Sequence, residues 1–259
     1  MSIRRVVVDL GGVLFRFDHA HRLQRLAAAF SLAPDRVDAL LWKSGFSAEC
    51  DRGAFASAVD VRAAIRAATG FTGGDEQLDA EWCSAFRPDH AVREALHRHR
   101  GSRSLALFTN NGPLEEEALP RLHPELFDGF GQLLFSHRLG HRKPGPAAFA
   151  AATRRLDAVP DEILFIDDHL GNTDAARSFG WHAVHFRGPE TIEQALGVAP
   201  EHRRDREHAL EVDVGLRGPE RRDANGSGHP TRMPPGGRRP HGDDRPHQAN
   251  GLYQPRFRP

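Results

Sequence analysis

The stretch that most constrains the fold is an apolar run near the start of the chain that ends in an acidic residue. Residues 6–8 are all valine, Asp9 follows at once, and Gly11 and Gly12 come shortly after it. Three consecutive valines predict a strand buried on both faces, which is typical of inner strands in parallel sheets. Open α/β sheets bind their ligands at the carboxyl ends of such strands. Asp9 is therefore a candidate site residue, although aspartate before glycine also commonly forms a simple turn.

The rest of the chain alternates between apolar runs and segments with helical spacing. Runs at 104–108 and 162–166 predict further buried strands, and runs at 132–135 and 182–186 predict two more strands. Residues 18–86, by contrast, show helical spacing and no convincing strand. We expect an α/β fold, a Rossmann-like parallel sheet with helices on both faces and an inserted all-helical segment. The predicted division is a core domain of residues 1–17 and 87–198 and a helical domain of residues 18–86.

The composition argues against several classes of protein. Hydrophobic residues make up 39% of the chain, without an apolar run long enough (about 18 residues) to span a membrane. The formal net charge is zero, so no global basic field attracts nucleic acid or acidic membranes. The two cysteines, Cys50 and Cys83, suit a reducing compartment, and no secretion signal is visible. We expect a cytoplasmic monomer or homodimer with no nucleic-acid or membrane partner.

The last sixty or so residues differ in composition from the rest. From residue 201 onward there are 12 arginines, nine acidic residues, eight prolines and eight glycines, with one tyrosine and one phenylalanine. Such a segment cannot bury enough apolar surface to offset the entropy lost on ordering. We predict that residues 199–259 form a disordered basic tail, and we favour passive disorder over a role in binding an acidic partner.

Further polar residues follow the predicted strands in order. They are Thr109, Lys143, the pair Asp167 and Asp168, and Asn172. Each has an ordinary explanation as a turn residue, a solvated charge or a helix cap. Together with Asp9 they form the set needed to transfer a phosphoryl group through an aspartyl-phosphate. A carboxylate attacks phosphorus, a hydroxyl and an ammonium hold its oxygens, and further carboxylates bind Mg²⁺.

Lysine at position 143 is unusual for this chain, which contains 33 arginines and only two lysines. A compact ammonium can touch both a nucleophile and a phosphate where a wide guanidinium would not fit. The retention of lysine here therefore favours a role in the site, although chance retention is the alternative.

In the order of these motifs the chain resembles the haloacid dehalogenase-like hydrolase superfamily over residues 1–198. The matching motifs are Asp9-Leu10-Gly11-Gly12-Val13, Phe108-Thr109-Asn110, Arg142-Lys143-Pro144, and Ile166-Asp167-Asp168 with Asn172. Response-regulator receivers use similar residues, but there the acidic pair comes first and the lysine last. The combination indicates the phosphatase branch, with enzymes similar to sugar-1-phosphate phosphatases, and the helical segment looks like its type 1 cap.

The resemblance implies a role for each matching residue. Asp9 would be the nucleophile, and Thr109 and Lys143 would bind phosphate and take part in catalysis, with Asn110 also contacting substrate. A Mg²⁺ ion would be held by Asp9, the Gly11 carbonyl, Asp168, Asp167 and Asn172.

One position departs from the family pattern. Most phosphatases of this superfamily carry a second aspartate two residues after the nucleophile, where this chain has Gly11. A general acid of this kind contributes about 10²–10⁴-fold. Asp18 is a candidate substitute, although we favour its role as a helix N-cap. Unless another donor exists, we expect anomeric sugar phosphates and aryl phosphates to react faster than primary alkyl phosphates.

The function predicted from the sequence is a Mg²⁺-dependent phosphatase that acts on small phosphate monoesters, sugar phosphates in particular. One alternative is a 2-haloacid dehalogenase, which also lacks the second aspartate but needs no metal. Asp167 and Asp168 argue against it, because adjacent carboxylates repel unless a cation lies between them. The other alternative is a non-catalytic phosphate-binding or interaction protein, which would require a broken nucleophile or metal site.

We predict that residues 201–259 are dispensable, because their composition cannot support a packed core. Deleting them is expected to leave the melting temperature and the turnover number nearly unchanged. A large loss of either quantity would show that the segment contributes to the folded domain.

Overall fold

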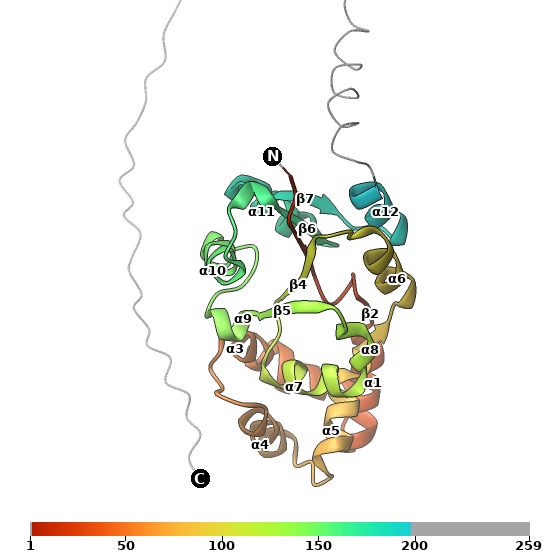
Figure 1. The fold of residues 1–259 in the computed structure, drawn as a ribbon. Coiled ribbons are helices and arrows are strands. Elements are labelled where there is room, and N and C mark those ends of the chain that lie inside the picture. Colours follow the sequence, from red (N-terminus) through yellow and green to blue (C-terminus); the bar gives the residue numbers. More distant parts are fainter. Residues whose placement is uncertain (1, 198–259) are drawn as a thin grey trace, which may run out of the picture. The chain divides into compact units, whose positions relative to one another are not determined.

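A five-stranded parallel sheet forms the centre of the computed structural model, which describes residues 2–197 (Figure 1). The strand order is β5-β4-β1-β6-β7, so that the valine strand lies in the middle, paired with β4 on one side and β6 on the other. The five strands are β1 (Arg5–Val8), β4 (Ser104–Thr109), β5 (Phe130–Phe135), β6 (Ile163–Asp167) and β7 (His182–His185). The predicted fold class is confirmed.

Helices cover both faces of the sheet, and the alternation of side chains along each strand explains why. Val7 packs with residues of α10 (Pro146–Leu156) and α11 (Leu170–Phe179), while its neighbours Val6 and Val8 belong to the core on the opposite face. That opposite face carries α6 (His90–His99) and α12 (Pro189–Gly197). Figure 1 shows these two pairs of helices on opposite sides of the strands. Burial on both faces accounts for the unbroken apolar run.

The remaining helices lie between β1 and β4 or connect the later strands. Those before β4 are α1 (His19–Phe30), α2 (Pro34–Asp38), a π-helix at Ala39–Lys43, α3 (Phe46–Arg52), α4 (Ala58–Thr69), α5 (Asp75–Trp82) and a 3₁₀-helix at Cys83–Ala85. Later in the chain are α7 (Pro113–Leu122), α8 (Pro124–Phe127), α9 (Ser136–Leu139) and a 3₁₀-helix at Pro160–Glu162.

A short antiparallel pair, β2 (Phe15–Phe17) and β3 (Phe86–Pro88), joins the helices of residues 19–85 to the rest of the molecule. The sequence analysis did not predict it, because three-residue strands leave no measurable periodicity. Aromatic contacts hold the pair together, with the Phe17 and Phe86 ring centroids 5.1 Å apart. The division into core and helical domains stays a prediction. The tail predicted for residues 199–259, and residue 198 of the predicted core, lie outside the described residues.

A buried ion-pair cluster links helices α4 and α5 to α7. The Arg62 guanidinium on α4 donates two hydrogen bonds to Asp79 on α5, at 2.8 and 2.7 Å. Asp79 also accepts from Arg121 of α7 at 2.6 Å, and Arg62 reaches Glu117 of the same helix at 2.7 Å. The paired hydrogen bonds between Arg62 and Asp79 offset the free-energy cost of removing these charges from water. This cluster therefore fixes the inserted helices against α7.

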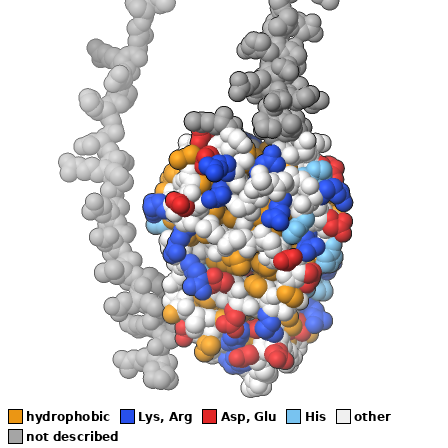
Figure 2. Space-filling view, viewed as in Figure 1, with side chains coloured by type: hydrophobic (Ala, Val, Ile, Leu, Met, Phe, Trp, Pro, Cys, Tyr) orange, Lys and Arg blue, Asp and Glu red, His pale blue; other side chains and the backbone are white. Residues whose placement is uncertain are grey.

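In the described part of the chain, every helix is too short or too polar to cross a membrane. On the face seen in Figure 2, acidic and basic side chains are interspersed.

We expect Asp79→Ala to lower the free energy of unfolding by about 3 kcal/mol, because it leaves the buried Arg62 guanidinium without its principal partner. Glu117→Ala removes a half-exposed partner of the same arginine and is expected to cost less than about 1 kcal/mol. Denaturant unfolding of both variants measures the difference. Equal effects would contradict the importance given to the buried pair.

Candidate active site

The predicted site residues meet at the carboxyl edge of the sheet because β4, β1 and β6 are adjacent and parallel. Asp9 directly follows β1, Thr109 ends β4, and Asp167 ends β6. The chain runs from β1 to β4 and β5 on one side, then returns to β6 and β7 on the other. Such a change of direction opens a crevice in which α/β proteins bind ligands.

The Lys143 ammonium lies between two of these carboxylates. Its Nζ is 2.9 Å from Asp9 Oδ1 and 2.7 Å from Asp167 Oδ2, and it donates to the Phe108 carbonyl at 2.8 Å. The side chain is almost fully buried, at 4% exposure for the residue. Burial alone would lower the pKa of this ammonium, but the two carboxylates raise the pKa above its ordinary value. Lys143 is therefore a fixed positive charge in the site.

Asn110 positions the loop that carries Lys143. Its amide nitrogen donates to the Lys143 carbonyl and its amide oxygen accepts from the Lys143 backbone nitrogen, both at 2.9 Å. Thr109, the preceding residue, is buried and its hydroxyl accepts a hydrogen bond from Asn111 Nδ2 at 2.6 Å. The Phe108-Thr109-Asn110 motif thus contacts Lys143 at both its ammonium and its backbone.

Three carboxylates converge beside this lysine. Asp9, Asp167 and Asp168 each offer an oxygen, and these oxygens lie within 4.8 Å of one another. Burial, together with the charge of Asp167, raises the pKa of Asp9 to about 7 against the opposing effect of Lys143. Burial and Asp167 likewise raise the pKa of Asp168. Three such oxygens fit a hard divalent cation, whose charge would favour the ionised carboxylates.

Asp167 is the most enclosed member of the cluster. Besides Lys143, it accepts hydrogen bonds from Asn172 Nδ2, at 3.0 Å to each oxygen, and from the His169 backbone nitrogen at 2.8 Å. Asn172 therefore orients Asp167 through its amide nitrogen, and its predicted role as a metal ligand stays a prediction.

Gly12 lets the Asp168 side chain approach the loop after β1. Its φ is +86°, and a Cβ added there would lie 2.1 Å from Asp168 Oδ2. Only glycine combines this backbone conformation with so close a contact. Gly11 has no such conformation, and a Cβ added to it would meet the Phe17 and Phe86 rings at 3.4 Å. The metal-ligand role predicted for the Gly11 carbonyl stays a prediction.

A cavity of about 360 Å³ borders this edge and lies between the inserted helices and the loop after β4. Its walls include Arg22, Trp42 and Asp51 from the helices, and Asn110, Asn111 and Glu115 from the segment after β4. Phe17 and His19 also line it. The cavity can therefore hold the part of a substrate that extends from Asn110 toward the helices.

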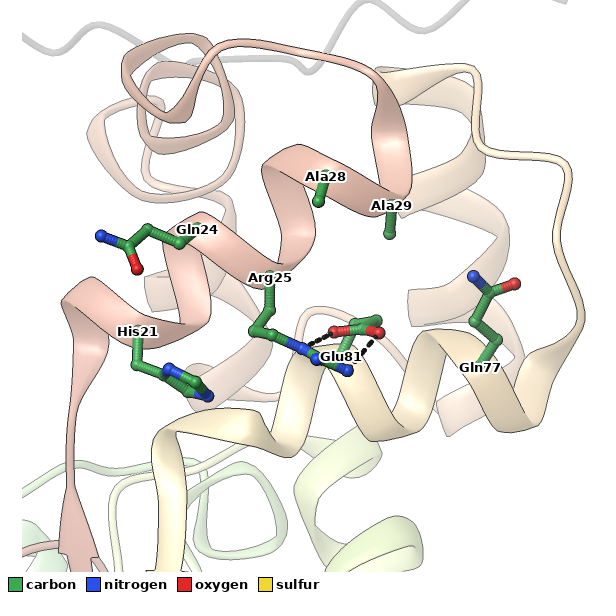
Figure 3. Close-up of a pocket in the computed structure, with 7 residues that line it drawn as sticks. All are labelled: His21, Gln24, Arg25, Ala28, Ala29, Gln77 and Glu81. Carbon is green, nitrogen blue, oxygen red and sulfur yellow. Dashed lines mark hydrogen bonds and ion pairs between the residues drawn. The ribbon is translucent and has the colours of Figure 1, made fainter.

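A second cavity of about 370 Å³ lies elsewhere, between α1 and α5 (Figure 3). Its charged residues, Arg25 and Glu81, already pair with each other at 2.7 and 2.8 Å. None of the predicted site residues lines this second cavity. We therefore do not assign it to the active site, although it is as large as the first.

Some residues of the site were missed or left open by the sequence analysis. Asp18, the candidate proton donor, accepts a hydrogen bond from the His21 backbone nitrogen at 2.9 Å. It therefore caps the N-terminus of α1, which is the role that the sequence analysis favoured for it. Asp51 and Arg142 form an ion pair of 3.1 Å that no local pattern indicates. Glu115 could have been found, since it shares the buried face of α7 with Ala118 and Leu119 at helical spacing.

The chain is similar to a known hydrolase family and to several characterised proteins. The family model described as "haloacid dehalogenase-like hydrolase" matches residues 3–180. An (S)-2-haloacid dehalogenase 2 from Pseudomonas sp. (strain CBS-3) is 31% identical over 120 residues, which are 45% of this chain and 51% of that protein. A phosphorylated carbohydrates phosphatase from Thermotoga maritima is 28% identical over 112 residues, which are 42% and 51%. This chain spans about half the length of these curated relatives.

Among solved structures, a HAD-family enzyme from Bacteroides thetaiotaomicron, in complex with magnesium and inorganic phosphate, is similar with a TM-score of 0.58. It is 22% identical, and the match covers 78% of this chain and 98% of that one. At this level of identity the likeness shows the fold.

If the three carboxylates bind Mg²⁺, the ion should raise the melting temperature. We expect Gly12→Ala to abolish that rise, because the new methyl group would displace the Asp168 carboxylate. Gly45→Ala is the matched control, since Gly45 has a similar φ of +88° but no atom within 4 Å of an added Cβ. It should lower stability alone and keep the Mg²⁺-dependent shift. An unchanged shift in Gly12→Ala would contradict the placement of the metal site.

Proposed function

This chain belongs to the haloacid dehalogenase-like hydrolase family, and we propose that it is a Mg²⁺-dependent phosphatase acting on small phosphate monoesters. The observation that carries the proposal is the buried Lys143 ammonium, which contacts Asp9 and Asp167 next to a third carboxylate. A nucleophilic carboxylate, a fixed cation and a cation-binding cluster at one strand edge are the requirements of aspartyl-phosphate chemistry.

The contacts of Asp9 suggest which of its two carboxylate oxygens is the nucleophile. Its Oδ1 accepts from the Leu10 backbone nitrogen at 2.7 Å and lies 2.9 Å from Lys143. Neither contact uses Oδ2, which we propose attacks phosphorus and forms the aspartyl-phosphate. Lys143 would stabilise the negative charge on the phosphoryl oxygens, and the Thr109 hydroxyl and Asn110 would bind the same group.

Mg²⁺ would be held by Asp9, Asp167 and Asp168, with the Gly11 carbonyl and Asn172 as further candidate ligands, and would neutralise charge on the transferred group. The same carboxylates separate this proposal from dehalogenation, the activity named for one relative. Displacement of a halide from carbon needs no metal. Three carboxylates whose oxygens lie within 4.8 Å of one another carry more negative charge than the single Lys143 ammonium balances, so they call for a second cation. Burial and the charge of Asp167 raise the pKa values of Asp9 and Asp168, and a bound cation would favour their ionised forms.

The cavity beside the site supports a polyhydroxylated leaving group, and we propose sugar phosphates as the substrate class. Phe17, which is 47% exposed, and Trp42 offer apolar surface for a sugar ring. Arg22 also lines this cavity, and a guanidinium offers hydrogen-bond donors to substrate hydroxyls. The name of the Thermotoga maritima relative, a phosphorylated carbohydrates phosphatase, agrees with this class.

The two cysteines bear on the cellular compartment that we propose for the enzyme. Cys50 and Cys83 are buried and free, which suits a reducing, cytoplasmic environment. We propose that the chain acts as a monomer or homodimer on a small phosphate ester, without a nucleic-acid or membrane partner.

We expect purified protein to release phosphate from a panel of phosphate esters with Mg²⁺ and to lose this activity in EDTA. Asp9→Asn should abolish turnover, because an amide is a poor nucleophile, without lowering the melting temperature. Halide release from 2-haloacids, measured in parallel, should be absent. Metal-independent halide release without phosphatase activity would instead establish the dehalogenase function.

A further inference from the structure

The proposed phosphatase reaction needs a group that donates a proton to the leaving oxygen, and Gly11 has no side chain to do so. At Gly11, where most phosphatases of this superfamily carry an aspartate, a side chain would point toward the Phe17 and Phe86 rings. Asp18 is 44% exposed at its side chain, caps α1, and does not line the cavity beside the site. The donor must therefore come from elsewhere on the cavity wall, where the titratable candidates are His19, Glu115 and Asp51.

His19 is not suited to donate a proton. Its Nδ1 lies 3.0 Å from Arg22 Nη2 and accepts from that guanidinium, because arginine can only donate. Burial and the charge of Arg22 lower the pKa of His19, so that the imidazole is neutral at neutral pH.

Glu115 is engaged on the side facing the inserted helices. It is buried and accepts a hydrogen bond from the Trp82 indole nitrogen at 2.7 Å. Burial raises the pKa of Glu115, and the charge of Arg22 opposes this rise. The carboxylate also accepts hydrogen bonds from the backbone of Gly112 and of Glu115 itself. A carboxylate held by several fixed donors is less free to exchange a proton with a leaving oxygen than one without them.

Asp51, by contrast, is held against the catalytic loops. Its backbone carbonyl accepts from Ser136 Oγ at 2.7 Å, and its Oδ2 lies 3.1 Å from Nη2 of Arg142, the residue before Lys143. The carboxyl is largely buried, with the residue 8% exposed, and it lines the same cavity as Asn110.

Close backbone approaches on both sides of Asp51 fix its position. A Cβ added at Gly112 would lie 2.9 Å from the Cβ of Cys50, the residue before Asp51. A Cβ added at Gly53, two residues after it, would lie 2.5 Å from the His137 carbonyl oxygen. The end of α3 therefore contacts the core so tightly that Asp51 keeps a defined position on the wall of the cavity that Asn110 also lines.

We propose that Asp51 is the proton donor that replaces the missing aspartate at Gly11; this assignment rests on the proposed phosphatase function. As Asp9 Oδ2 bonds to phosphorus and the bond from phosphorus to the leaving oxygen breaks, the Asp51 carboxyl gives its proton to that oxygen. The Asp51 carboxylate then takes a proton from water, whose oxygen bonds to phosphorus. The bond between Asp9 and phosphorus breaks, which releases inorganic phosphate and restores both carboxyl groups.

The charges around Asp51 suit this exchange. Burial and Glu115 raise the pKa of Asp51, while Arg142, Arg22 and Arg52 lower it, with a net rise to about 7. Arg142 does not hold the carboxyl in a two-pronged pair, since its buried Nε has no hydrogen-bond partner in the described part of the chain. Such a carboxyl is partly protonated at neutral pH and can both give and take a proton.

The test is Asp51→Asn, assayed as kcat/KM on a primary alkyl phosphate and on p-nitrophenyl phosphate. Loss of the acid should lower kcat/KM for the alkyl ester by about 10²-fold or more. The aryl ester, whose leaving group needs no proton, should change by less than about threefold. The alkyl pH profile of the unmodified protein should fall above about pH 7, the pKa of Asp51, and this fall should be absent in the variant.

Two further variants complete the experiment. Asp18→Asn is the matched control, and it should show no selective loss on the alkyl ester. Arg142→Met removes a cation beside Asp51, raises its pKa, and should shift the fall in the alkyl pH profile to higher pH, a readout that survives if Asp51→Asn does not fold.

The outcomes separate the two proposals. An equal loss on both esters in Asp51→Asn, or a pH profile that Arg142→Met leaves unmoved, would overturn the assignment of Asp51 and leave the phosphatase intact. A wild-type protein inactive on every ester would overturn the proposed function itself.

Discussion

The contact of one buried ammonium with two carboxylates is the interaction on which the site depends. Lys143 lies within 2.9 Å of both Asp9 and Asp167, in a place where an unpaired charge would be strongly unfavourable. Asp167 is satisfied in turn by Asn172 and by the backbone of His169. Because these groups come from different strands and loops, they meet only when the sheet is fully formed. The chemistry therefore depends on the strand order and not on any one segment.

Glycines allow close contacts both within the site and between the inserted helices and the rest of the molecule. Gly12 admits the Asp168 carboxylate, whereas Gly53 and Gly112 bring the end of α3 against the core. The cavity that would hold the leaving group is consequently built by both parts of the chain, with Asp51 contributed by one and Asn110 by the other. Side chains at these glycines would separate the two parts. The proton donor that we propose, Asp51, therefore comes from the inserted helices rather than from the loop after β1.

The sequence predicted the parts of this molecule that local patterns determine. The inner strands β1, β4 and β6 were found because their apolar runs mark burial on two faces. Asp9, Thr109 and Asp167 were found because each ends or follows such a run. The outer strands β5 and β7 were also found, although much of each is exposed or half-buried. The β2–β3 pair was missed because three-residue strands carry no periodicity. The Asp51–Arg142 pair joins residues far apart in the sequence, and only the folded chain brings them together. The roles of Gly53 and Gly112 likewise depend on neighbours that local patterns cannot identify.

The central claim is that Asp9 attacks phosphorus and that water then attacks the same phosphorus. A single turnover in isotopically labelled water tests it directly, because the position of the label reports which bond water breaks. The account predicts label in the released inorganic phosphate and none in the Asp9 carboxylate, as measured by mass spectrometry of the product and of the Asp9 peptide. Label in the Asp9 carboxylate would show that water attacks the aspartyl carbon, as in hydrolysis of a carbon ester, and would contradict the account.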